Sequence, residues 1–145
     1  MAHPTPQDAV TDGEIADCYD VMAELRPHVP RERFVALVRE LERDGFRLAY
    51  IKDGGRVVAC AGYRYGHNLF YGRHLYVDDL VTADSVRSKG YGKTLLGWLR
   101  ALAVEKGCDA FHLDSGVQRK RAHQFYQREG LEHSSHHFSV RLRPR

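Results

Sequence analysis

The sequence feature that most constrains the fold lies near the middle of the chain. There a strand pattern, a basic glycine-rich loop and an apolar helix pattern follow one another. Residues 74–82 read H-L-Y-V-D-D-L-V-T and are rich in the β-branched and aromatic residues typical of strands. The loop R-S-K-G-Y-G-K-T-L-L occupies residues 87–96, and helical spacing follows in Leu95, Leu96, Leu99, Leu102 and Ala103. A strand that leads into a helix through so short a loop predicts a sheet with that helix packed on its face.

Two helices are predicted before this unit. The tetrapeptide T-D-G-E at residues 11–14 matches a capping box, and apolar residues then recur at helical spacing to about Arg26. A second helix is expected to begin near Pro30 and to end near Gly45. The N-terminal third of the chain is therefore predicted to be helical.

The rest of the chain predicts strands and one more helix. The tripeptide D-G-G at residues 53–55 is typical of a hairpin turn, and residues 66–73 read as a loop. Gly107 and Gly130 follow the two later helices, where glycine commonly ends a helix. The last helix is expected at residues 118–129, and the strands at residues 46–52, 56–65, 74–82, 110–113 and 131–142.

These elements predict a fold of the α/β (α+β) class, with a single mixed, mostly antiparallel sheet and helices on both faces. The 145 residues contain no repeat, low-complexity stretch or linker, so we expect one domain over residues 1–145. Residues 1–10 and 143–145 are expected to be loose termini. Because residues 3–10 are rich in proline and poor in strand formers, a strand before the first helix is expected to be short or missing.

The composition argues against several classes of protein. With 22 basic and 19 acidic residues the net charge is only +3, which argues against a nucleic-acid-binding face. No apolar run is long enough to span a membrane, and the N-terminus lacks a signal-peptide pattern. The cysteines Cys18, Cys60 and Cys108 show neither zinc-ligand spacing nor a disulfide framework, so we expect a cytoplasmic protein.

A histidine-rich segment, H-S-S-H-H at residues 133–137, invites a metal interpretation. In a strand His133 and His137 share a face, whereas His136 points away from it. No cysteine or acidic partner is placed by the spacing, so we expect no metal site. Substrate contact and an ordinary surface position are the two alternatives for these histidines.

The glycine-rich loop is the strongest candidate for a binding site. It fails as a P-loop because Arg87 stands where that motif needs its first glycine, and as a dinucleotide fingerprint because Leu95 stands where a third glycine is needed. A loop that opens a helix still presents unpaired amide groups to an anion. The loop therefore predicts either a phosphate site or an ordinary turn with surface cations.

Two motifs together resemble the GNAT superfamily of N-acetyltransferases. V-R-S-K-G-Y-G at residues 86–92 matches the family's Arg/Gln-x-x-Gly-x-Gly/Ala loop, and A-H-Q-F-Y-Q-R-E-G-L at residues 122–131 resembles its second signature. The two motifs stand in the family's order, and the resemblance covers nearly the whole chain. The N-terminus departs from it, because the family usually opens with a strand.

The resemblance implies acetyl-CoA as co-substrate and a sheet splayed between its central strands. Main-chain groups of Leu80 and Thr82 would pair with the pantetheine arm, and the amide of Leu80 or Val81 would face the thioester oxygen. The pyrophosphate would be held by the loop, which comprises Arg87, Ser88, Lys89, Gly90, Tyr91, Gly92 and Lys93.

The resemblance also names candidate catalytic residues. Tyr126 lies where the family carries the acid that protonates the departing thiolate; the alternative is an aromatic core position beside Phe125. Asp79 directly precedes Leu80 and is the first candidate for the base. Asp114, at the end of the next strand, is the second candidate, and a structural charge is the plain alternative for each. Asp79 and its neighbour Asp78 are expected to face opposite sides of the sheet.

The implied function is acetyl transfer from acetyl-CoA to a small-molecule amine, by direct attack through a tetrahedral intermediate. The sequence looks most like aminoalkylphosphonate and amino-sugar phosphate members, so Arg119, Lys120 and Arg121 would meet an anionic substrate or the cofactor's 3′-phosphate. The alternatives are a protein lysine or N-terminal acetyltransferase and a non-catalytic acyl-CoA-binding module. A homodimer is also implied, because the final strands of family members often pair across a two-fold axis.

Overall fold

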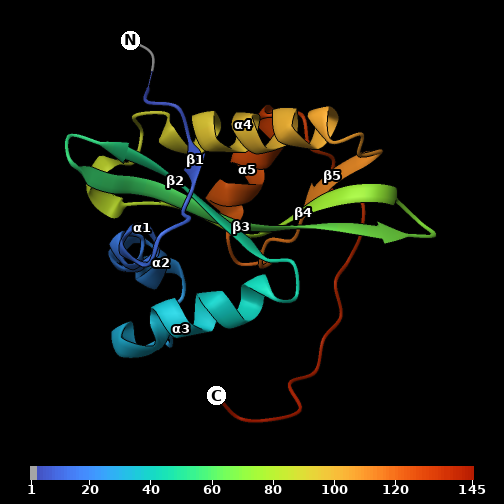
Figure 1. The fold of residues 1–145 in the computed structure, drawn as a ribbon. Helices are drawn as coiled ribbons and strands as arrows, with labels where there is room; N and C mark the ends of the chain where they lie inside the picture. The colour runs from blue at the N-terminus through green and yellow to red at the C-terminus, as the bar shows by residue number, and fades with distance from the viewer. Residues whose placement is uncertain (1–2) are drawn as a thin grey trace.

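The computed structural model describes residues 3–145 and contains one five-stranded sheet in the order β1-β2-β3-β4-β5. Strands β1 to β4 pair antiparallel, and β5 pairs parallel with β4. Figure 1 shows α1, α2 and α3 on one face of the sheet and α4 on the other. The predicted mixed sheet with helices on both faces is confirmed. The elements are β1 (Gln7–Asp8), α1 (Asp12–Asp17), α2 (Tyr19–Leu25), α3 (Arg31–Glu42), β2 (Arg47–Asp53), β3 (Arg56–Asn68), β4 (Gly72–Thr82), the 3-10 helix η1 (Asp84–Val86), α4 (Tyr91–Glu105), β5 (Ala110–Leu113) and α5 (Lys120–Arg128).

Local sequence signals account for the starts and turns of these elements. The side chain of Thr11 accepts a hydrogen bond from the Glu14 amide at 3.1 Å, while the Thr11 amide donates to the Glu14 carboxylate at 2.9 Å. The predicted first helix is divided at Cys18 into α1 and α2. Gly54 and Gly55, at φ of 63° and 80°, form the two-residue turn between β2 and β3, where left-handed residues match the twist of the strands.

The hairpin of β3 and β4 is longer than predicted. The expected loop at residues 66–73 is too wide, because β3 extends to Asn68 and β4 begins at Gly72. His67 pairs with Arg73 and Asn68 with Gly72 in the ladder. These polar residues carry little strand signal, but pairing satisfies their main-chain groups.

The N-terminal segment is more ordered than expected. Gln7 pairs with Tyr50 and Asp8 with Ala49, so a short first strand is present, and Ala9 is buried. The expectation of a loose segment over residues 1–10 is therefore wrong from Gln7 onward. Residues 1 and 2 of that range lie outside the described residues.

The predicted last strand is absent from the described part of the chain. Residues 131–142 follow α5 without helix or strand, and Figure 1 shows the end of the chain running away from the sheet. Phe138, Val140 and Leu142 are 91%, 79% and 90% exposed. Their alternation is typical of a strand, but a strand also needs a neighbouring main chain to bond, and no edge of the sheet pairs with this segment.

The sheet opens between its parallel strands. Pairing of β4 with β5 ends at Val77 and Leu113, whereas β4 continues to Thr82. The predicted splay between central strands therefore lies along residues 78–82, which keep β3 as their neighbour on one side only. Within residues 3–145, no helix combines the length and apolar character needed to cross a membrane.

Candidate active site

The loop between β4 and α4 has the backbone of an anion site. Ser88 and Gly90 both adopt left-handed conformations, with φ of 76° and 84°. Gly90 stands at the N-cap of α4, and no side chain caps this helix start. Left-handed residues next to a helix start gather amide groups into a concave, electropositive surface. The geometry therefore suits a phosphate.

The side chains of this loop differ in their exposure and in their hydrogen-bond and ion-pair partners. Lys89 and Lys93 are exposed, whereas the Arg87 guanidinium lies 2.7 Å from the Asp84 carboxylate. Tyr91 is buried, and its hydroxyl donates a hydrogen bond to Asp53 at 2.7 Å. Tyr91 thus ties the loop to the end of β2, so only its main chain is available to a ligand.

The N-terminal segment also packs against the loop. The imidazole of His3 lies 4.4 Å from the Tyr91 ring, and its Nδ1 is 2.9 Å from the Thr94 hydroxyl. A Cβ added to Gly90 would lie 3.2 Å from His3, and one added to Gly92 would lie 3.3 Å from the Thr82 hydroxyl. Sequence reasoning missed His3, because no local pattern links it to a loop almost ninety residues away.

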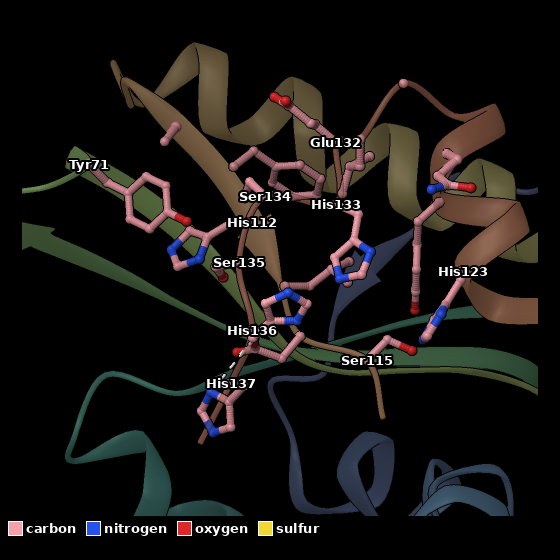
Figure 2. A pocket seen from close by; sticks show the side chains of 18 of the residues that line it. Tyr71, His112, Ser115, His123, Glu132, His133, Ser134, Ser135, His136 and His137 are labelled. Carbon is pink, nitrogen blue, oxygen red and sulfur yellow. Dashed lines mark ion pairs between the residues drawn. The ribbon is translucent and has the colours of Figure 1, made fainter. Parts of the chain in front are cut away.

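A cavity of about 1220 Å³ lies among β5, α5 and the segment that follows α5. Tyr126 and Asp114 both line it. Figure 2 shows the histidines of α5 and of the C-terminal segment gathered around the same space. The histidines that line the cavity are His112, His123, His133, His136 and His137.

Tyr126 stands on α5 with a free hydroxyl. Within residues 3–145 the hydroxyl makes no hydrogen bond, and the Phe125 ring is 5.4 Å away. Burial raises the pKa of the Tyr126 phenol, and the nearby Arg119 opposes this rise. The phenol therefore stays protonated at neutral pH and can give up its proton inside the cavity.

Asp114 directly follows Leu113, the last residue of β5. Its Oδ2 accepts a hydrogen bond of 2.6 Å from the Tyr76 hydroxyl, while its Oδ1 lies 3.8 Å from Nδ1 of His137. The next residue, Ser115, has a buried hydroxyl without a hydrogen-bond partner in the described residues. An unsatisfied buried hydroxyl in a cavity wall indicates a place for a polar ligand group.

Asp79 lies apart from this cavity. Its Oδ1 is 2.7 Å from Nε of Arg26, and it lines a separate hollow of about 190 Å³ between α2, α3 and β2. Burial raises the pKa of the Asp79 carboxyl, and Arg26 opposes the rise. Of the three predicted catalytic residues, the fold thus brings together Tyr126 and Asp114 but not Asp79.

Asp78 and Asp79 were expected to face opposite sides of the sheet because side chains alternate along a strand, but β4 is not a regular strand at this point. A bulge places Gly62 opposite Asp79 and Tyr63 opposite Val77, so Asp78 has no cross-strand partner. A bulge interrupts the alternation on which the argument rests. Both carboxylates are instead bound by arginines, Asp78 by Arg64 and Asp79 by Arg26.

The histidine-rich segment does not assemble a metal cluster in the described residues. The rings of His133 and His136 are 5.7 Å apart, and those of His123 and His133 are 6.2 Å apart. Within residues 3–145, no group of three histidine, cysteine or acidic side chains is placed to bind one ion. These imidazoles line the cavity as separate hydrogen-bonding groups.

Comparison with known proteins identifies the family. The family model described as Acetyltransferase (GNAT) family matches residues 14–131. The chain belongs to the GNAT acetyltransferase family. The family membership that the two motifs predicted is confirmed. The chain is an acetyltransferase, and its family uses acetyl-CoA as co-substrate.

Individual relatives agree with this assignment. This GNAT chain is 34% identical over 114 residues to YhdJ, an uncharacterized N-acetyltransferase of Bacillus subtilis (strain 168), covering 78% of this chain and 80% of the relative. It is 32% identical over 66 residues to the aminoalkylphosphonate N-acetyltransferase of Salmonella typhimurium, covering 46% and 43% of the two chains. Its fold matches an aminoglycoside N-acetyltransferase in complex with a CoA bisubstrate analogue, with a TM-score of 0.84, 17% identity, and coverage of 99% and 100%.

The open edge of this GNAT sheet fits the co-substrate. Residues 78–82 of β4 extend beyond the pairing with β5, and the left-handed loop at Ser88 and Gly90 follows in sequence. One sheet edge can bond an extended amide-bearing chain, and the loop can receive phosphate.

Proposed function

We propose that the chain transfers the acetyl group of acetyl-CoA to the primary amine of a small molecule that also carries an anionic group. The observation that carries this proposal is the cavity wall formed by Tyr126 and Asp114. It places an unpaired phenol and a carboxylate in one cavity lined by β5, α5 and the segment after α5, and Asp114 directly follows the last residue of β5 that pairs with β4. Acetyl-CoA, when bound, supplies an activated acyl group with a thiolate as leaving group.

Each catalytic side chain has one proton to move. The acceptor ammonium first loses one proton to solvent, and the neutral nitrogen then gives a second proton to Asp114 as it bonds to the acyl carbon. As the C–S bond breaks, Tyr126 gives its proton to the departing sulfur. Solvent then returns the proton from Asp114 to Tyr126. We prefer Asp114 to Asp79 as the base because an arginine already occupies the Asp79 carboxylate.

The cofactor loop has a separate proposed role. Amide groups of the loop residues would hold the pyrophosphate, and the exposed Lys89 and Lys93 would add positive charge. Main-chain groups of Leu80 and Thr82 would pair with the pantetheine arm, while the amide of Leu80 or Val81 would face the thioester oxygen. The open edge of β4 supports this arrangement.

The anionic substrate class rests on the cavity lining and on one relative. Lys120, Arg100 and the cavity histidines offer hydrogen-bond donors to an anionic group. The Salmonella relative is named for aminoalkylphosphonates, which pair an amine with such a group. Arg119 and Arg121 stand beside Lys120 at the start of α5 and would add positive charge near the anionic group of the substrate.

A matched amine panel tests the proposed function. With free thiol as the readout, we expect 2-aminoethylphosphonate to have a kcat/KM about 10- to 100-fold higher than propylamine, because each charge-assisted hydrogen bond contributes about 1.5–3 kcal/mol. Acetyl-CoA at about 100 times its Kd should also stabilise the fold by roughly 2.7 kcal/mol, with ATP as control.

The other outcomes of this panel name the alternatives. Preference for lysine peptides over all small amines would indicate a protein acetyltransferase. Stabilisation by acetyl-CoA without turnover of any amine would indicate a non-catalytic acyl-CoA-binding module. A larger stabilisation by ATP than by acetyl-CoA would contradict the proposal altogether.

We further propose a homodimer in which residues 136–142 pair with a second copy. Phe138, Val140 and Leu142 alternate and are exposed, and β5 is an edge strand with an unpaired outer side. The unpaired main-chain N–H and C=O groups of an edge strand can form hydrogen bonds with an extended segment of another chain. A cytoplasmic location and the absence of nucleic-acid binding stay predictions.

Light scattering after size-exclusion chromatography tests the dimer. We expect twice the 16.6 kDa chain mass, and Val140→Glu should return the chain to a monomer, because it would bury a charge in the pairing. Leu69→Glu is the control, since Leu69 is fully exposed at the tip of the β3–β4 hairpin. A monomeric unmodified chain would contradict the proposal.

A further inference from the structure

Asp114 has a hydrogen-bond partner that the family resemblance did not name. Asp114 lies just beyond the end of β5, so the strand ladder does not hold its main chain. Tyr76 on the neighbouring strand donates its hydroxyl proton to Oδ2 of Asp114 at 2.6 Å. This bond spans the two strands at the point where they part, because Tyr76 is paired with His112, two residues before Asp114.

The Tyr76 ring is held by its surroundings. The guanidinium of Arg64 lies over the ring, 5.5 Å from its centroid, and binds Asp78 through two hydrogen bonds of 2.8 Å each. The His112 ring lies 4.9 Å from the Tyr76 ring, and Tyr71 stacks on His112 at 4.1 Å. A phenol packed in this way has few alternative positions for its hydroxyl.

The two carboxylate oxygens of Asp114 therefore differ. Oδ2 is occupied by Tyr76, whereas Oδ1 lies 3.8 Å from Nδ1 of His137, too far for a hydrogen bond. The Asp114 side chain is 44% exposed and lines the cavity, so Oδ1 is the oxygen open to a ligand. Figure 2 shows His137 joined to this carboxylate by the dashed line.

We propose that Tyr76 is a positioning residue that holds Asp114 so that its Oδ1 receives the acceptor amine and its proton. The inference rests on the proposed function, in which Asp114 is the base. Tyr76 touches neither the acceptor nor the acyl group and acts only through Asp114. Without the phenol, Asp114 keeps its carboxylate but turns among several rotamers at an exposed strand end. The expected result is a misplaced base.

A double-mutant cycle tests this role. Tyr76→Phe keeps the ring and removes the hydroxyl, so we expect kcat to fall about 10- to 100-fold with the KM for acetyl-CoA unchanged. In an Asp114→Asn background the same substitution should cost less than about 2-fold, because residues that act through one another are not additive. Tyr65→Phe is the control, since its hydroxyl makes no hydrogen bond in the described residues.

The outcomes separate this inference from the proposed function. Equal losses in both backgrounds, or no loss in the unmodified background, would overturn the role of Tyr76 alone. An unmodified chain that acetylates no amine would overturn the proposed function instead. In that case the crystal structure of Tyr76→Phe still decides the positioning: we expect several Asp114 rotamers, and a single unchanged rotamer would refute it.

Discussion

Replacing Tyr126 with phenylalanine is expected to lower kcat about 100- to 1,000-fold, while binding of acetyl-CoA stays within about 3-fold of the unmodified enzyme. Phenylalanine keeps the ring on α5 and removes only the hydroxyl, which bonds no described residue. Folding should therefore be preserved. The thiolate would then leave without a proton donor, and this raises the barrier of the step in which the C–S bond breaks.

The pH dependence gives a second check on Tyr126. Its phenol acts in the protonated form, so activity is full below its pKa and is lost as the pH rises through it. Burial raises the pKa above the ordinary phenol value of about 10, so kcat should show no decline from this group below about pH 10. A kcat for Tyr126→Phe within a few-fold of the unmodified enzyme would show that Tyr126 is only a packing residue.

Replacing Gly90 with valine is expected to weaken acetyl-CoA binding about 100-fold or more, as measured by titration calorimetry. Gly90 has a φ of 84°, a conformation that β-branched residues avoid, and the new Cβ would lie 3.2 Å from His3. The loop must move, so its amides no longer converge on one anion. Loss of two hydrogen bonds to a charged group, at about 1.5–3 kcal/mol each, accounts for the expected size of the effect.

A glycine inside α4, the helix that follows this loop, provides the control. Gly97 in α4 is exposed and has no atom within 4 Å of an added Cβ. Gly97→Ala should leave acetyl-CoA binding unchanged and stabilise the fold by roughly 0.5–1 kcal/mol, because alanine favours the helix. Unchanged binding in Gly90→Val would show that the loop is an ordinary turn and not the phosphate site.

Local patterns predicted most of the elements that build the site. Strand β4, the glycine-rich loop and helix α4 follow from residue type and spacing, and the loop backbone at Gly90 is left-handed as a binding turn needs. The hairpin turn at Gly54 and the capping box at Thr11 were also predicted from the sequence, since each depends on residues within four positions of one another. The motif at Gly90 and the signature around Tyr126 also pointed to the family, which the comparisons confirm.

Non-local contacts decided the rest. The pairing of Asp79 with Arg26 joins residues 53 positions apart, and that of Asp114 with Tyr76 joins residues 38 positions apart. No periodicity of the sequence indicates such pairs. The sequence therefore ranked Asp79 ahead of Asp114 as the base, whereas in the fold Asp114, and not Asp79, lines the same cavity as Tyr126.

The chain's own sequence thus determined most of its elements and its glycine-rich loop, because these depend on short-range sterics and hydrogen bonding, and its motifs pointed to its family. Only the tertiary structure decided which strands have partners and which charged groups stay free. Residues 131–142 carry a strand pattern without a strand, since a strand requires a second main chain that the sequence cannot place. Asp114 lines the cavity, whereas Asp79 is bound by an arginine, since burial and neighbours are properties of the assembled fold.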